Sequence, residues 1–453
     1  MSNDAPDPID LHRLRALAER AVDAALAAGG QSADAVALTS SALSATVRNG
    51  VVEEAESAEA TDLGLRVFVG QRSALVGVSP KADLAEAAAR AVAMAKAAPE
   101  DETQGLPDPA LLATAIDADA LDIADAARPR MDELTDRAHR LEHAMLKVPG
   151  VTNSGGAFAS ATRAGRWLAT SGGFSAGYLT SRHAHSGTAV AGEGTRMERD
   201  SWSSVRRHLA DLADIAAVGR IAAERAVRKM DAERLTTRTA TIVFEPRAAS
   251  GFVGHLLQAV NGSAVARGAS LLAGKLGAKV LADGITIRDD PSLVRGLASR
   301  PFDGEGLGCG PLDIVADGVL AAYVLDLATA RKLALDPNGR AGRGTGSPAP
   351  TTTNVTVHGG SGTMEDLLKD AGTGLLVTDL IGMGANIVNG SYSRGAAGFW
   401  FEGGEIVHPV SEITIAGHLA DMFARARFAD DAPGLYIVDA PSVAIEGLTI
   451  GGR

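Results

Sequence analysis

Apolar side chains recur every three or four residues in several stretches of the N-terminal half. The first stretch runs from Leu11 to Ala25, with Asp10 before it as a helix cap and Gly29-Gly30 after it as a stop. The same spacing predicts further helices over residues 82–97, 133–147 and 212–230.

Apolar and polar residues alternate between these helices, which indicates strands. A hairpin is predicted from Leu43 to Glu56 with its turn at Asn49-Gly50, because both residues accept the positive φ of a two-residue turn. A second strand pair is expected at residues 65–69 and 73–79, and several short strands between 151 and 200. The proline-containing stretch 98–131 is expected to be a loosely structured connection.

The C-terminal half is rich in predicted strands separated by glycines. A strand begins at Thr239, a hairpin turns at Asp317-Gly318, and a helical stretch is expected from Ala248 to Leu276. Strands and helices do not alternate regularly, so the sequence favours an α+β fold with mixed or antiparallel sheets and packed helices. We predict two domains, an N-terminal α+β domain (1–234) and a strand-rich C-terminal domain (235–453).

Charge and composition exclude several classes of function. The 43 basic and 55 acidic residues give a net charge of −12, which argues against a nucleic-acid partner. The single cysteine, Cys309, excludes a disulfide within the chain. No apolar run reaches the roughly 18 residues of a membrane span, and no secretory signal is visible. We therefore expect a cytoplasmic protein without a membrane partner.

One short motif matches a signature of zinc peptidases. His139, Glu142 and His143 fit the pattern H-x-x-E-H, in which two imidazoles on one helix turn bind zinc beside a glutamate. The alternative is the solvated face of a surface helix. The apolar stripe of that helix points away from both histidines and favours this alternative; its members are Leu134, Ala138, Leu141, Met145 and Val148.

Other candidate sites have simpler structural explanations. His183 and His185 share one face of a predicted strand and could hold a metal, but an exposed strand is favoured because no nearby carboxylate or cysteine completes a ligand set and Arg182 would oppose a cation. Residues 173–177 spell G-x-S-x-G, yet a strand rather than a helix is expected to follow. The glycine-rich loop 339–347 lacks the lysine of a phosphate loop and is expected to be mobile. Nothing basic in sequence flanks Cys309 to activate it.

Three longer blocks carry a resemblance to a known family. They are residues 49–79, residues 327–357 and residues 374–419, and the last contains the segment NIVNGSYSRGAAGF. Together these blocks resemble the TldD/PmbA family (peptidase U62, modulator of DNA gyrase), and specifically its PmbA branch, also called TldE. The resemblance runs almost from end to end of the chain.

The resemblance implies a cytoplasmic α+β protein of two domains. Members of the two branches pair as a TldD–TldE heterodimer that hydrolyses peptides and partly unfolded proteins. The TldD branch carries zinc on a helix with the motif His-Glu-x-x-x-His and has a later cysteine. The corresponding stretch here has His255 followed by leucine, and Gln258 and Asn261 are poor zinc ligands. No metal ligands are therefore assigned in this chain, and zinc is expected in a TldD-like partner.

These observations define three hypotheses. The first is a subunit without a metal site, inactive alone because His-Glu-x-x-x-His is absent, that works on peptides with a TldD-like partner. The second is a self-sufficient zinc metallopeptidase that uses His139, Glu142 and His143. The third is an adaptor that binds peptides without hydrolysing them. A homodimer in the absence of the partner stays open.

Peptide or partner contacts are expected from two polar loops rather than from catalytic residues. Polar side chains between glycines can present hydrogen bonds to an extended backbone, although a purely structural turn explains them as well. Ser391 departs from the acidic residue that the resemblance implies there, and His418 is expected to be structural. The candidate residues are Arg340, Arg343, Asn386, Asn389, Ser391, Tyr392, Ser393 and Arg394.

Overall fold

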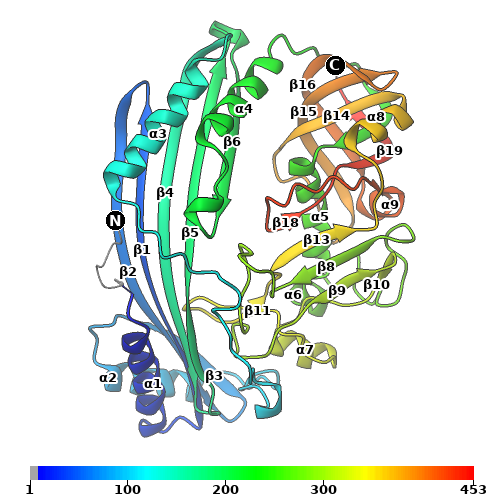
Figure 1. Cartoon of the computed structure of the whole chain (residues 1–453). Helices are drawn as coiled ribbons and strands as arrows, with labels where there is room; N and C mark the ends of the chain where they lie inside the picture. Colours follow the sequence, from blue (N-terminus) through cyan, green and yellow to red (C-terminus); the bar gives the residue numbers. More distant parts are fainter. Residues whose placement is uncertain (1–8, 453) are drawn as a thin grey trace.

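A computed structural model describes residues 9–452 of the chain. Helices and sheets occur in both halves, so the predicted α+β class is confirmed. One long sheet belongs to the N-terminal half, and two compact sheets and a separate two-stranded pair belong to the C-terminal half (Figure 1). The division into two domains at residues 234 and 235 stays a prediction.

The N-terminal half is built on six antiparallel strands in the order β3-β2-β1-β4-β5-β6. The hairpin at Asn49-Gly50 is present, with φ of 51° and 74° at these two residues. Two long strands replace the several short ones expected after residue 150. The strands are β1 (Ser32–Arg48), β2 (Val51–Val69), β3 (Arg72–Val78), β4 (Val151–Thr170), β5 (Ser175–Ala191) and β6 (Glu198–Arg206).

Four helices cover one face of this sheet in two separate pairs. The first pair packs at one end of β1 against Ala33, Ala35 and Ala37, and the second at the other end against Ala45 and Val47. Alanine on both surfaces lets helix and sheet approach closely, which explains why so few aromatic residues suffice. The helices are α1 (Leu11–Ala27) with α2 (Leu84–Ala97), and α3 (Met131–Leu146) with α4 (Ile215–Arg228).

The C-terminal half contains a closed barrel. Five strands run in the order β16-β15-β14-β7-β19, and β16 pairs again with β19, for example Ile415 with Ile450, so the ring closes. The short strand β17 (Arg427–Phe428) adds to β19. The barrel strands are β7 (Arg238–Phe244), β14 (Thr373–Ile381), β15 (Ser391–Glu402), β16 (Glu405–His418) and β19 (Val443–Gly451).

A second sheet of the C-terminal half has the order β10-β9-β8-β13-β18, and β11 pairs with β12 apart from it. Its strands are β8 (Thr286–Asp290), β9 (Leu312–Ala316), β10 (Val319–Leu320), β13 (Asn354–His358) and β18 (Val438–Asp439); the separate pair is β11 (Ala341–Gly342) with β12 (Ala349–Pro350).

Helices of this half are short. The helical stretch expected to reach Leu276 instead divides into α5 and α6 and ends at Ala266, because Asn261 caps a new helix and Gly268 adopts a positive φ. The helices of the C-terminal half are α5 (Pro246–Ala259), α6 (Gly262–Ala266), α7 (Leu327–Leu333), α8 (Met364–Ala371) and α9 (Leu419–Arg425).

A buried ion-pair network joins the two halves near the start of β1. Asp34 of β1 lies 2.6 Å from Arg66 of β2 and 2.6 Å from Arg343 of the C-terminal half. Burial alone would raise the pKa of Asp34, but Arg343 and Arg66 more than offset it and hold that pKa below its usual value. Glu305 lies 3.7 Å from Arg66, and burial raises its pKa to about 7.

A second network joins the halves at β6. Asp200 is surrounded by Arg225 of α4, by Lys229 directly after that helix and by Arg247 of α5, at 3.1, 2.8 and 3.1 Å. Burial would raise the pKa of Asp200, but these three cations bring it down to about 2. Arg247 and Lys229 also reach Asp379 of β14. Through Arg247, this second network ties α5 to β6 of the long sheet.

Candidate functional site

One face of α5 is left uncovered by the rest of the C-terminal half. The buried face packs into the core through residues such as Phe252, Val253 and Leu256. The opposite face carries Gly251, Gly254 and the exposed Gln258 at helical spacing. A side chain added at Gly254 would meet nothing within 4 Å. This face is therefore open, and it belongs to the stretch that corresponds to the zinc-binding helix of the TldD branch.

His255 is the one histidine on α5, and it lies against β15. Its ring centroid is 5.9 Å from that of Tyr392, in an edge-to-face arrangement. No group in residues 9–452 hydrogen-bonds either ring nitrogen. Burial, with a smaller effect of Arg394, lowers the pKa of His255 to about 4, so the imidazole is neutral at pH 7.

Zinc does not fit the residues around His255. A structural or catalytic zinc takes at least three protein ligands from histidine, cysteine and carboxylates. The neighbours here are a phenol and the guanidinium of Arg394, which repels a cation. Throughout the described part of the chain, no group of three or more such side chains is arranged to hold a metal ion. Cys309, elsewhere in the fold, donates to the carbonyl of Arg300, and burial raises the pKa of its thiol.

The turn between β14 and β15 stands beside this helix face. The Asn386 side chain accepts from the amides of Val388 and Asn389, and the Asn389 side chain accepts from that of Ser391. These asparagines therefore hold the turn together, and His418 helps by bonding the carbonyl of Asn389 at 3.0 Å.

The same turn exposes apolar side chains that sequence reasoning missed. Ile381 is 66% exposed, Met383 is 102% exposed and Val388 is 54% exposed. The sequence carries a signal for them, because aliphatic residues stand between the glycines of residues 381–390. Among the predicted contact residues nearby, Ser391 and Ser393 are exposed, Arg394 is half-buried, and Tyr392 is buried with no partner for its hydroxyl within residues 9–452.

Arg340 and Arg343 lie apart from this turn, in a loop that is not the mobile surface expected. Arg340 is fully buried, pairs with Asp289 and donates to the carbonyl of Gly310. Arg343 inserts between the halves and pairs with Asp34. A buried guanidinium requires a carboxylate at close range, and a sequence does not show that distant partner.

The H-x-x-E-H motif lies on α3, and its glutamate faces the long sheet. His143 is exposed and His139 is half-buried, but Glu142 is 2% exposed rather than on the solvated face. Its two oxygens accept the amides of Asn49 and Gly50, each at 2.7 Å. The glutamate therefore stabilises the tip of the β1–β2 hairpin.

His183 and His185 lie on one face of β5 as predicted, but that strand face is buried rather than exposed. His183 lies 3.2 Å from Asp125, while burial lowers the pKa of His185 to about 4. Ser175 of the G-x-S-x-G motif starts β5 and donates to Glu19, so it has no nucleophile geometry.

Known proteins match this chain along nearly its whole length. Family models of the PmbA/TldA metallopeptidases match residues 33–95 (domain 1), 124–230 (central domain) and 237–452 (C-terminal domain). The chain is 36% identical to metalloprotease PmbA of Escherichia coli O157:H7, with 97% of each chain covered. It is 34% identical to a metalloprotease PmbA homolog of Haemophilus influenzae, covering 97% of this chain and 96% of the relative.

Solved structures share the whole fold. A protein described as a modulator of DNA gyrase, from Bacteroides thetaiotaomicron, superposes with a TM-score of 0.89 at 25% identity and covers 97% of this chain and 99% of its own. TldE from Thermococcus kodakarensis has the same fold, with a TM-score of 0.83 at 21% identity and coverage of 96% and 99%. Because three family models and full-length relatives agree, the chain belongs to the PmbA/TldA metallopeptidase family, as its sequence indicated.

Proposed function

We propose that this chain is the subunit without a metal site in a two-chain cytoplasmic peptidase of its family. Its partner is a TldD-like chain that binds zinc, and its substrates are peptides and partly unfolded proteins. The observation that carries this proposal is α5, whose open face presents glycines and Gln258, while its one histidine, His255, is neutral and packs against Tyr392 instead of joining a ligand set. A metallopeptidase relative of the TldD type exists, since a metalloprotease TldD homolog of Buchnera aphidicola is 25% identical over 218 residues, 44% of each chain.

Exposed apolar side chains support pairing with another protein. Ile381, Met383 and Val388 project from one turn beside the open face of α5. Aliphatic side chains this exposed are typical of surfaces that a partner covers. A chain that closes a chamber over a neighbouring active site would need such a rim.

Peptide hydrolysis by the purified chain alone and with a TldD-like partner tests this function. We expect no zinc retained and no hydrolysis by this chain alone, and hydrolysis once the partner is added. Activity or a tightly held zinc in the pure chain would contradict the proposal. Peptide binding without hydrolysis, even beside an active partner, would indicate the adaptor. Sedimentation of the chain alone would show whether it forms a homodimer.

The self-sufficient alternative has less support. It requires Glu142 to face a metal-bound water, whereas both carboxylate oxygens of Glu142 already accept backbone amides. Hydrolysis that survives in a His139→Ala/His143→Ala variant would exclude this alternative independently of the partner.

A further inference from the structure

The long strand β2 leaves much of one edge without a partner. Its inner edge pairs with β1 along the whole hairpin, but β3 pairs with its outer edge only from Leu63 to Val69. From Val51 to Asp62, no strand within residues 9–452 pairs with the outer edge, and every residue is exposed. This edge forms one border of the long sheet (Figure 1).

The free edge begins where β3 ends. Val78 is the last residue of β3, and Pro80 follows, which cannot donate to a ladder. Pairing with β1 is regular from Asp62 to Glu54, and the register shifts only beyond Glu54, near the hairpin tip. Nine consecutive residues therefore offer unpaired backbone groups in regular strand geometry, without a proline or a bulge to block them.

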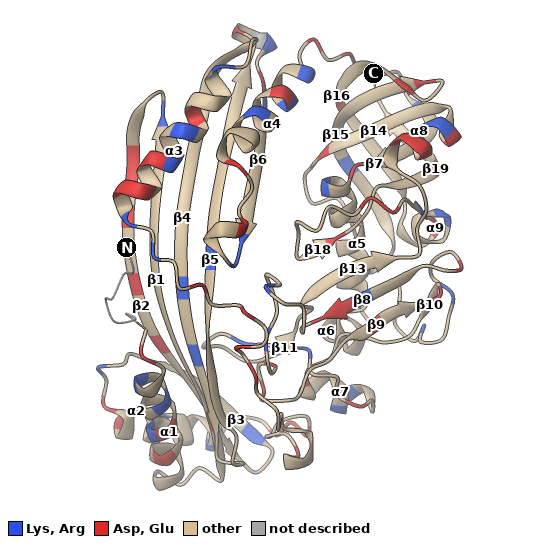
Figure 2. Cartoon of the chain, in the orientation of Figure 1, with Lys and Arg blue, Asp and Glu red and all other residues tan. Residues whose placement is uncertain are grey.

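Side chains on this segment are arranged by charge. Thr61 and Thr39 lie on the helix-covered face, and their hydroxyls are 2.9 Å apart. Because side chains alternate along a strand, the even-numbered residues of β2 lie on the opposite face, which faces the C-terminal half. Three acids, Glu54, Glu56 and Asp62, lie on the face toward the C-terminal half. Glu59, on the helix-covered face, is the remaining ionisable residue of the segment. Figure 2 shows the acidic positions along β2 in red. None of these four acids forms an ion pair within residues 9–452.

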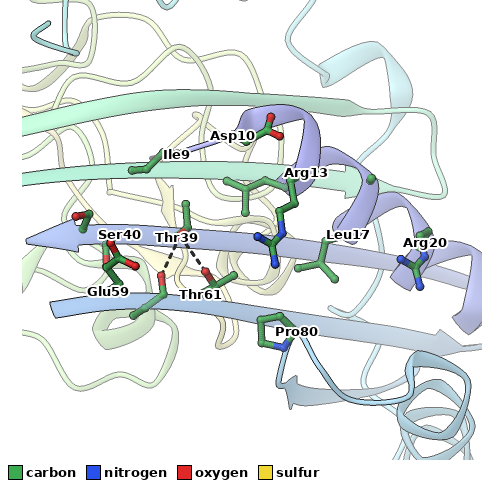
Figure 3. Close-up of a pocket in the computed structure, with 14 residues that line it drawn as sticks. Ile9, Asp10, Arg13, Leu17, Arg20, Thr39, Ser40, Glu59, Thr61 and Pro80 are labelled. Carbon is green, nitrogen blue, oxygen red and sulfur yellow. Dashed lines mark hydrogen bonds between the residues drawn. The ribbon is translucent and has the colours of Figure 1, made fainter. Parts of the chain in front are cut away.

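A cavity opens beside the same edge on the helix-covered face. It has a volume of about 520 Å³ and is lined by residues of β2, including Glu59 and Thr61, by Pro80, and by Arg13 and Arg20 of α1 (Figure 3). Its lining combines apolar side chains such as Leu14 and Leu17 with polar ones and with charges of both signs. An uncharged or hydrogen-bonding side chain suits this cavity, whereas the opposite face selects for positive charge.

The charges argue against a second copy of this edge as the partner. Two identical edges would set carboxylates opposite carboxylates, which destabilises strand pairing. We propose that residues 54–62 bind an extended polypeptide segment as an added strand, and that this segment carries lysine or arginine at alternate positions. Backbone hydrogen bonds would supply affinity, and the acidic face would select the basic side chains. This surface is separate from α5, so the proposal goes beyond the proposed function and does not depend on it.

Hydrogen–deuterium exchange of the full chain with a twelve-residue peptide of alternating Lys and Thr tests this inference. We expect protection of amides confined to residues 51–62, and no protection with an alternating Glu-Thr peptide. The variant Glu54→Lys/Glu56→Lys/Asp62→Lys should weaken binding by about tenfold or more. A matched control, Glu86→Lys/Glu365→Lys/Glu405→Lys, makes the same charge change on exposed residues elsewhere and should bind as the parent chain does.

Several outcomes would overturn the inference. One is protection that is absent or lies outside residues 51–62. Another is an equal loss of binding in the control variant, which would indicate attraction to net charge alone. Protection of the edge that rises with chain concentration, without peptide, would identify a second copy as the occupant. Should the lysine variant fail to fold, Glu54→Gln/Glu56→Gln/Asp62→Asn removes the charges with little change in shape and should still weaken binding.

Discussion

Glu142 of α3 accepts a hydrogen bond from Gly50 at the tip of the β1–β2 hairpin, with one carboxylate oxygen 2.7 Å from the amide nitrogen of Gly50. The other oxygen accepts the amide of Asn49 at the same distance. Positive φ at both turn residues directs these amides toward a common acceptor. A residue that the sequence places in a metal motif thus serves as a cap between α3 and the long sheet.

The first prediction concerns this contact. Glu142→Ala leaves two amides of the turn without their buried acceptor, and each such loss costs about 1–3 kcal/mol. We expect a fall of roughly 2–4 kcal/mol in the free energy of unfolding, measured with urea. His143→Ala, one residue away and exposed, should change it by less than about 0.5 kcal/mol. Equal effects of the two variants would contradict the structural role of Glu142.

The second prediction concerns the network between the halves. Asp34→Asn leaves Arg66 and Arg343 buried beside a neutral amide, and removing one member of a buried ion pair costs about 3–5 kcal/mol. Urea unfolding and the rate of limited proteolysis between the halves measure the effect. Asp62→Asn, on the exposed part of β2, is the matched control. Little change in the Asp34 variant would show that the halves are held together elsewhere.

The third prediction concerns pH. His255 has its pKa lowered to about 4 from 6.5 by burial, so below pH 6.5 the unfolded chain binds more protons than the folded one. The free energy of unfolding should therefore fall as the pH drops from 6.5 toward 4. His255→Phe should flatten this fall, while Gln258→Ala on the same helix face should leave its slope unchanged. His185 contributes in the same window, so some slope should remain. Identical slopes in all three chains would contradict the burial of His255.

The fourth prediction concerns the apolar turn. Met383→Asp places a charge where the side chain is fully exposed, so thermal stability of the chain should change by less than about 0.5 kcal/mol. Affinity for a TldD-like partner should fall by about tenfold or more, because an interface core excludes unpaired charge. Val294→Asp, at a residue that is 66% exposed elsewhere, is the control. Unchanged affinity in the Met383 variant would place the partner surface away from this turn.

Local patterns in the sequence determined much of the secondary structure. The Asn49-Gly50 and Asp317-Gly318 turns, the stripe of α3 and the capping of α1 by Asp10 depend on residues close together in the chain, so propensity and spacing predict them. A His-Glu-x-x-x-His motif occupies consecutive residues of a single helix, so the sequence alone shows that His255 is not part of one.

Tertiary structure decided which polar residues are buried and what they contact. Asp34 and Arg343 are far apart in sequence, and only the packing of the two halves brings them to 2.6 Å. The closure of the barrel through β16 and β19 and the free edge of β2 likewise depend on long-range pairing. Propensity and spacing predict the local elements and show that His255 stands in no His-Glu-x-x-x-His motif. The fold decided the burial of Arg340, His185 and Glu142, because desolvation depends on neighbours that no local pattern encodes.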